Sequence, residues 1–249
     1  MLLENRTAVV YGAGGAIGGA LARGFAAEGA RCVLVGRTPG PLDTTAAAVR
    51  ASGGRAETAV LDALDEAAVN DHADSVAAAT GSLDISVNVI TQEAVFGPLA
   101  DLPVADVARS VAGTVTSQLI TTRAAARHMG KQGSGVILFF GGSDGIYKQP
   151  GMGSVQIGMD VVEGIRRQWA CELGPLGVRV LTLLTGGIPE TFPDAPEMEP
   201  AKQAIADATL LGRAATLEDV GRVAAFVASD RARSMTATQV NISCGAHGD

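Results

Sequence analysis

The beginning of the chain joins a short apolar run to a cluster of glycines, and the cluster leads into small and apolar residues at helical spacing. The apolar run is Val9–Tyr11, and five glycines follow between positions 12 and 19. Glycine lets a backbone turn sharply and come close to a pyrophosphate, while the unpaired N–H groups and the positive dipole end of a helix attract anionic oxygens. The stretch therefore predicts a strand, a tight turn and a helix that hold the phosphates of a dinucleotide.

A second strand pattern follows this helix at the distance expected for a nucleotide-binding unit. Glu28–Ala30 indicates the end of the helix, and residues 31–35 form a mostly apolar run that leads into Gly36, Arg37 and Thr38. The unit of strand, helix and strand has the length of about 30 residues that is typical of dinucleotide sites. This context supports a nucleotide site more strongly than a glycine cluster does alone.

The remainder of the chain alternates between strand and helix patterns, which predicts a parallel sheet with helices on both faces. We expect an α/β fold: a Rossmann-type doubly wound parallel sheet in a three-layer α/β/α arrangement, with residues 1–249 as a single domain. A chain of 249 residues with 47% hydrophobic content suffices for one such core. The expected strands lie at residues 7–11, 31–36, 56–61, 84–90, 135–140, 178–184 and 238–243.

One segment breaks the alternation, because prolines and acidic residues gather in it. Its prolines are Pro189, Pro193, Pro196 and Pro200. Its place after a late strand suits a loop that covers a substrate, and we expect residues 189–209 to form such a lid. A solvated loop without a role in ligand choice is an equal alternative.

Composition and charge argue against several classes of protein. The net charge of −7 at pH 7 argues against a nucleic-acid surface, which needs a basic face. No charged and then apolar leader precedes the first strand, and no apolar run approaches the length that spans a bilayer. Cys32, Cys171 and Cys244 lack metal-ligand spacing, which indicates reduced thiols. We expect a cytoplasmic protein without a metal site, a membrane contact or a nucleic-acid partner.

Several motifs resemble those of short-chain dehydrogenases/reductases, and they occur in the order found in that family. The spacing Gly12-xxx-Ala16-x-Gly18 is similar to the family's Gly-xxx-Gly-x-Gly loop. The stretch Asp84–Asn88 looks like the strand that leads into its Asn-Asn-Ala-Gly motif, and Arg123–Met129 looks like its long fourth helix. The resemblance implies a nicotinamide-nucleotide fold, and a homotetramer or homodimer joined through the fourth and fifth helices.

The resemblance continues towards the end of the chain. The segment Thr185–Ile188 is similar to the one that holds the nicotinamide amide through backbone groups, and Thr216–Val220 resembles the capping pattern of the family's last helix. The residues that these motifs imply for cofactor binding are Gly12, Gly15, Ile17, Gly18, Asn88, Gly186 and Ile188.

Two further residues bear on the adenosine end of the nucleotide. An acidic residue after the second strand would hold the ribose hydroxyls of NAD(H), but Gly36 and Arg37 stand there. A guanidinium pairs with a ribose phosphate, so Arg37 predicts NADP(H) rather than NAD(H). The carboxylate of Asp62 either accepts a hydrogen bond from the adenine amino group or caps the helix that starts at Asp65.

The residues that carry the family's chemistry are absent. Members reduce a carbonyl with a serine, a tyrosine and a lysine, the last two four residues apart on one helix. These positions fall on Gly142, Val155 and Met159, whose side chains have no proton to donate and no charge. Neither tyrosine of the chain, Tyr11 or Tyr147, is followed by a lysine four residues later. Loss of a positioned general acid costs about 10²–10⁴-fold in rate, so ordinary alcohol–ketone interconversion is not expected.

The first of three functions that fit these observations is an atypical NADP(H)-dependent oxidoreductase. Other donors then stabilise the charge that develops during hydride transfer, and conjugate reduction of an activated alkene needs a strong acid less than carbonyl reduction does. The candidate catalytic residues are Ser143 and Tyr147. Further polar groups of interest are Asp144, Lys148, Thr91, Gln92, Thr114 and Gln156.

The other two functions do not require redox chemistry. One is a catalytically silent NADP(H)-binding protein that acts as a sensor or as a structural subunit. The other is a non-redox cyclase or isomerase that folds its substrate in an apolar pocket. The side chains of Val155, Met159, Val89 and Ile90 would line that pocket, which predicts a small hydrophobic substrate or ligand.

Overall fold

The computed structural model describes residues 1–90, 94–141 and 150–247. These residues form one parallel sheet of seven strands in the order β3-β2-β1-β4-β5-β6-β7. The strand order reverses between β1 and β4, and ligands of such sheets bind there, beyond the carboxyl ends of the strands. The predicted Rossmann-type fold is confirmed. Its strands are β1 Thr7–Tyr11, β2 Arg31–Gly36, β3 Arg55–Val60, β4 Ile85–Asn88, β5 Gly135–Gly141, β6 Val178–Leu184 and β7 Gln239–Asn241.

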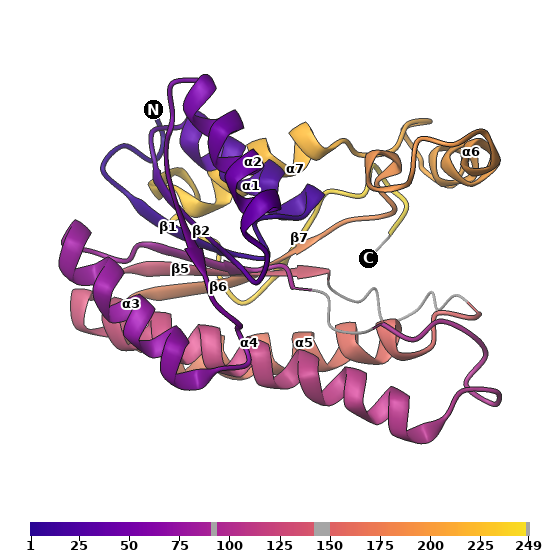
Figure 1. Cartoon of the computed structure of the whole chain (residues 1–249), viewed down its shortest axis with the longest axis horizontal. Coiled ribbons are helices and arrows are strands. Elements are labelled where there is room, and N and C mark those ends of the chain that lie inside the picture. Colours follow the sequence, from indigo (N-terminus) through magenta and orange to yellow (C-terminus); the bar gives the residue numbers. More distant parts are fainter. Residues whose placement is uncertain (91–93, 142–149, 248–249) are drawn as a thin grey trace.

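Helices cover both faces of the sheet, as Figure 1 shows. One face carries α1 Ala16–Ala27, α2 Pro39–Ala51 and α7 Leu217–Ala228. The other carries α3 Glu66–Thr80, α4 Val104–Gln132 and α5 Ser154–Leu173. Short 3₁₀ turns, η1 Gly174–Leu176, η2 Pro189–Thr191, η3 Pro196–Met198 and η4 Asp230–Ala232, lie between these elements, and α6 Glu199–Asp207 stands apart from both layers.

Each face of the sheet has its own apolar core, because successive side chains of a strand point to opposite faces. In β1, the side chain of Val10 belongs to the core under α1, α2 and α7. Its neighbours Val9 and Tyr11 belong to the core under α3, α4 and α5. The central strands are buried on both sides, which explains why they are apolar throughout.

The expected strand at 84–90 is shorter in the structure. The backbone N–H of Ile90 donates to the side-chain Oδ1 of Asn88 at 2.9 Å rather than to a neighbouring strand. The Val89 N–H still donates to the Tyr11 carbonyl at 3.1 Å, and the local hydrogen bond of Ile90 then ends the ladder, because the asparagine side chain replaces the next backbone partner.

Helices α1 and α7 approach each other closely at two glycines. A Cβ on Gly24 would lie 2.3 Å from the carbonyl oxygen of Gly221, so neither position accepts a side chain without displacement of a helix. The capping pattern expected at the start of the last helix is confirmed: Thr216 accepts from the N–H of Asp219 at 3.0 Å, and the Asp219 carboxylate accepts from the N–H of Thr216 at 3.1 Å.

The segment 189–209 is not the irregular loop expected from its prolines. It contains η2, η3 and the helix α6. Prolines occupy the first positions of these helices, where a missing N–H costs nothing.

In the part of the chain that the structure describes, no helix has both the length and the apolar composition needed to cross a membrane. The same residues contain no group of three acidic, histidine or cysteine side chains arranged for a metal ion.

Candidate functional site

The turn between β1 and α1 is shaped for an anion. Gly12 has φ +85°, and its N–H donates to the Val35 carbonyl at 2.9 Å, so the turn is fixed to the end of β2. A Cβ on Gly18 would lie 2.3 Å from the Gly12 carbonyl oxygen. Helix α1 begins after Gly15 without any side-chain cap, which leaves the N–H groups of its first turn for a ligand. This part of the predicted site fits the phosphates of a dinucleotide.

A second helix supports the phosphate turn from outside. The hydroxyl of Thr45 in α2 donates to the Ala13 carbonyl at 3.0 Å. A Cβ on Gly14 would lie 2.9 Å from Pro41 Cβ, so α2 packs directly on the turn. Ile17 is half-buried in the first turn of α1, and its side chain packs on the core of that face.

Arg37 and Asp62 lie on neighbouring strand ends at the adenosine side. Arg37 follows β2 directly and is exposed, with no hydrogen bond or ion pair in the described part of the chain. Its guanidinium is therefore available to a phosphate. Asp62 is also exposed, and its Oδ1 accepts from the Leu64 N–H at 3.0 Å. The alternative that Asp62 caps the next helix is wrong, because Asp65 is the cap and accepts from the Ala68 N–H at 3.0 Å.

The side chain of Asn88 is occupied within the fold. It is 4% exposed, its Nδ2 donates to the Thr121 hydroxyl at 3.1 Å, and its Oδ1 accepts from Ile90. It holds the end of β4 against α4. The following two residues are apolar and lie on the phosphate turn, because a Cβ on Gly12 would be 3.2 Å from Val89 Cγ2 and 3.3 Å from Ile90 Cγ1.

The segment after β6 lies between residues 189–209 and the end of the chain. A Cβ on Gly187 would be 2.8 Å from Ile205 Cδ1, so α6 packs directly over this segment. On the other side, a Cβ on Gly186 would be 3.2 Å from Ala246 Cβ. Ile188 is 3% exposed and anchors the segment in the core. These contacts place α6 against the expected nicotinamide segment, and the role of residues 189–209 as a lid stays a prediction.

Helix α5 presents apolar side chains where the family resemblance places the reactive dyad. Val155 and Met159 are both half-buried and lie one turn apart. The Cγ and Cε atoms of Met159 are 3.6 and 3.7 Å from the position of a Cβ on Gly141, at the carboxyl end of β5. Thr114 of α4 lies against Gly158, with its Oγ1 3.8 Å from a Cβ there. The candidate catalytic residues Ser143 and Tyr147, and Gly142, lie outside the described residues.

Other hydroxyls near this end of α5 are already engaged. Ser154, a residue that the sequence did not single out, is 1% exposed; its Oγ accepts from the Val95 N–H at 3.0 Å and lies 2.8 Å from the Ser110 Oγ. The Thr114 hydroxyl donates to the Ser110 carbonyl at 3.1 Å. The Ser154 hydroxyl therefore fastens the start of α5 both to the segment before α4 and, through Ser110, to α4 itself. Burial raises the pKa of Tyr11 far above its usual value, because no water solvates the phenolate.

A buried ion pair anchors α5 to the sheet. The Glu163 Oε2 accepts from Arg166 Nε at 3.0 Å and from Nη2 at 2.9 Å, and both side chains are almost fully buried. The hydroxyl of Thr182 in β6 donates to the other carboxylate oxygen of Glu163. No local pattern in the sequence identified this anchor, because Thr182 lies on a different element. It fixes the height of α5 relative to β6.

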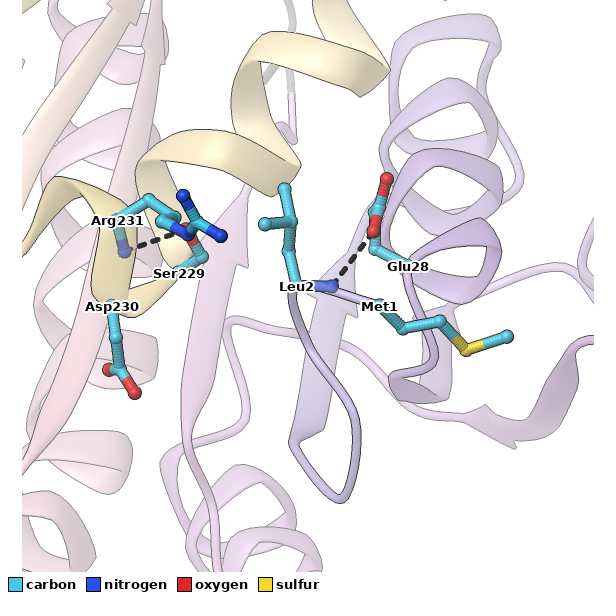
Figure 2. A pocket seen from close by; sticks show the side chains of 6 residues that line it. All are labelled: Met1, Leu2, Glu28, Ser229, Asp230 and Arg231. Atoms are coloured by element: carbon cyan, nitrogen blue, oxygen red, sulfur yellow. Dashed lines mark hydrogen bonds between the residues drawn. The ribbon is translucent and has the colours of Figure 1, made fainter.

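The opposite edge of the sheet carries two hollows, and neither resembles a ligand site. The larger, of about 530 Å³, is lined by Met1, Leu2, Glu28, Ser229, Asp230 and Arg231. Figure 2 shows two hydrogen bonds between its lining residues: the Leu2 N–H donates to Glu28 at 2.8 Å, and the Arg231 N–H donates to Ser229. In the smaller hollow, Arg6 pairs with Asp84 and Asp230.

Comparisons with known proteins agree with the fold. The sequence profile described as Enoyl-(Acyl carrier protein) reductase matches residues 12–247. The chain is 33% identical to cis-4-hydroxycyclohexanecarboxylate dehydrogenase from Sinomonas cyclohexanicum, over 92% of this chain and 91% of that protein. A crystal structure of NAD+-bound xylitol dehydrogenase has a TM-score of 0.88 at 25% identity, over 98% of this chain and 100% of that one. A short chain dehydrogenase from Burkholderia cenocepacia J2315 in complex with NADP has a TM-score of 0.84 at 27% identity, with 100% of both chains covered.

Proposed function

Because the chain belongs to the short-chain dehydrogenase/reductase family of oxidoreductases, we propose that it binds NADP(H) and reduces a small apolar acceptor without the family's tyrosine and lysine. When bound, NADPH would supply a hydride to a carbon atom of the acceptor and leave as NADP+, and water would supply the proton that completes the product. The observation that carries the proposal is the pairing of a complete phosphate turn with an apolar reactive face at Val155 and Met159.

The chain has residues suited to each part of NADP(H): the pyrophosphate, the 2′-phosphate and the nicotinamide amide. The first-turn N–H groups of α1 would hold the pyrophosphate, and the close contact between Gly12 and Gly18 keeps that turn narrow. The free guanidinium of Arg37 would pair with the 2′-phosphate, which supports NADP(H) over NAD(H). Backbone groups of Gly186 and Ile188 would hold the nicotinamide amide, since α6 and the end of the chain fix this segment on both sides.

The apolar face of α5 restricts the acceptor that the site can serve. A simple ketone gains full negative charge on oxygen during reduction, and without a positioned acid its rate falls by about 10²–10⁴-fold. An α,β-unsaturated carbonyl spreads that charge over several atoms, so it depends less on an acid. Val155 and Met159 would contact and orient the apolar part of such a substrate. We therefore propose an activated alkene as the acceptor.

Two measurements test this proposal. Titration of the protein with NADPH and NADH, followed by nucleotide fluorescence, should show tighter binding of NADPH. Loss of NADPH absorbance with a panel of apolar enones, ketones and alcohols should show turnover of enones alone. Binding without turnover would favour the catalytically silent alternative, and failure of both nucleotides to bind at millimolar concentration would overturn the proposal.

A further inference from the structure

Resting on the proposed function, we propose that Gln156 donates a hydrogen bond from its side-chain amide to the carbonyl oxygen of the acceptor. The amide binds and orients this oxygen and stabilises the charge that develops on it, but it transfers no proton. The acceptor is therefore a carbonyl compound with an apolar body, rather than an alkene activated by a group that offers no oxygen.

The side-chain amide of Gln156 has no hydrogen-bond partner among the described residues. Gln156 is half-buried in the first turn of α5, and its side chain makes no hydrogen bond in the described part of the chain. The neighbouring polar groups are engaged: Ser154 with Val95, and Thr114 with the carbonyl of Ser110. A half-buried amide without a partner among the described residues is available to a polar atom of a ligand, because no internal hydrogen bond has to break first.

Gln156 lies near the carboxyl edge of the sheet, as its distance along α5 from Glu163 shows. The Glu163–Thr182 hydrogen bond places Glu163 level with Thr182 on β6. Seven helical residues make almost two full turns, so Gln156 projects on the same side of α5 as Glu163, about 10 Å nearer the carboxyl edge. Three strand residues also span about 10 Å, which brings Gln156 level with the place where the chain leaves β6 and Thr185–Ile188 begins.

The neighbours of Gln156 on α5 place it beside the apolar residues of the expected reactive face. Residues three apart on a helix are neighbours, so Gln156 lies beside Met159. Met159 in turn lies on Gly141 at the end of β5. Gln156 is thus placed between the carboxyl ends of β5 and β6, at the edge of the apolar face that Val155 and Met159 form. A neutral amide there can donate a hydrogen bond to the carbonyl oxygen of the acceptor without placing an unpaired charge in an apolar site.

The test compares Gln156→Leu with a matched change on the outer face of the same helix. Gln168→Leu is the control, because Gln168 is exposed and its amide donates to Glu172 on the same outer face. The first readout needs no turnover. A ¹³C=O-labelled cyclohexenone is bound to the NADP+ complex, and the carbonyl stretch is followed by infrared difference spectroscopy. We expect a shift to lower frequency in the wild type and in the control, and its loss in Gln156→Leu, with unchanged nucleotide affinity and thermal midpoint.

The second readout is the pH profile of a third variant. In Gln156→Glu, the introduced carboxylate repels the developing oxyanion at neutral pH but donates a hydrogen bond once it is protonated. We expect kcat to fall on the order of 10²-fold at neutral pH and to recover as the pH falls. The wild type should show no such recovery. A role confined to folding would move the thermal midpoint and leave this pH dependence absent.

The outcomes separate this inference from the proposed function. An unshifted carbonyl band in the wild type, an equal shift in Gln156→Leu, or no binding of the labelled enone overturns the role of Gln156. NADPH binding with a shifted band but no turnover supports Gln156 as a ligand-binding residue and contradicts the oxidoreductase. Loss of NADPH binding in the wild type contradicts both.

Discussion

The carboxyl edge of the sheet has two halves that are built differently. At the ends of β1 and β2, backbone geometry shapes the candidate nucleotide site: Gly12 and Gly18 approach closely, and Arg37 has no hydrogen bond or ion pair among the described residues. At the ends of β4, β5 and β6, the polar side chain of Asn88 turns into the fold, and the apolar side chain of Met159, one turn of α5 from Val155, lies against the end of β5. Nucleotide binding that depends on backbone atoms can persist while the side chains that perform chemistry change. The two functions of such a site are therefore separable.

The largest effect should come from the anchor of the reactive half. Replacing Glu163 by alanine leaves the buried guanidinium of Arg166 unpaired and frees the Thr182 hydroxyl. We expect the free energy of unfolding to fall by about 3–5 kcal/mol. Urea denaturation measures this fall. A loss below 1 kcal/mol would show that α5 is held by packing alone.

In the nucleotide half, a side chain that disturbs the backbone of the turn should weaken NADPH binding. A methyl group at Gly18 clashes with the Gly12 carbonyl, so Gly18→Ala should lower the free energy of unfolding by about 1–3 kcal/mol and NADPH affinity by at least tenfold. Gly164→Ala is the matched control, since nothing lies within 4 Å of its Cβ and the position is exposed on α5. Calorimetry and nucleotide titration measure both quantities. Equal affinities in the two variants would contradict the assigned phosphate turn.

At the adenosine end of the site, the affinity for NADPH should depend on the charge of Arg37. Arg37→Ala removes the free guanidinium, and we expect NADPH affinity to fall by about 10–100-fold while NADH affinity stays unchanged. Arg23→Ala serves as a control for net charge, as Arg23 lies within α1. Titrations at two salt concentrations check the result. A parallel loss for both nucleotides would place Arg37 elsewhere on the ligand.

The smallest effect concerns α7, which packs against α1 behind the phosphate turn. The pKa of Asp219 is lowered by its hydrogen bond with the Thr216 backbone and then by Arg213. A lowered folded pKa contributes stability above the unfolded value of about 3.9, and this stability is lost as the pH falls through the folded pKa. Because the side chain is half-exposed, Asp219→Asn should cost about 1 kcal/mol or less at neutral pH and nothing at strongly acidic pH. A constant difference across this range, measured by thermal melts, would contradict the assignment.

Much of the fold could be predicted because its determinants are local in sequence. The glycine turn and the alternation of patterns gave the doubly wound sheet, and the strands at 7–11, 31–36 and 178–184 match their predicted bounds. Residues 189–209 were expected to form a loop because proline usually breaks helices. In the structure, Pro189, Pro196 and Pro200 occupy first positions of helical turns, where proline is tolerated.

The site could be predicted only in part. Counting along α5 located Val155 and Met159, and the structure places Met159 at the end of β5. The hydrogen bond of Ser154 with Val95 and that of Glu163 with Thr182 join residues from different elements, so no local pattern could reveal them. The roles of Ser143 and Tyr147, the preference for NADP(H) and the expected homotetramer or homodimer remain predictions.

The most direct test of the separation between the two halves is single-turnover reduction of a simple cyclic ketone by NADPH. It compares the wild type with the double variant Val155→Tyr, Met159→Lys, after nucleotide binding has been verified in both. The account predicts tight NADPH binding in both proteins, negligible ketone reduction by the wild type and measurable reduction by the double variant. Ketone reduction by the wild type at a rate ordinary for dehydrogenases would contradict it.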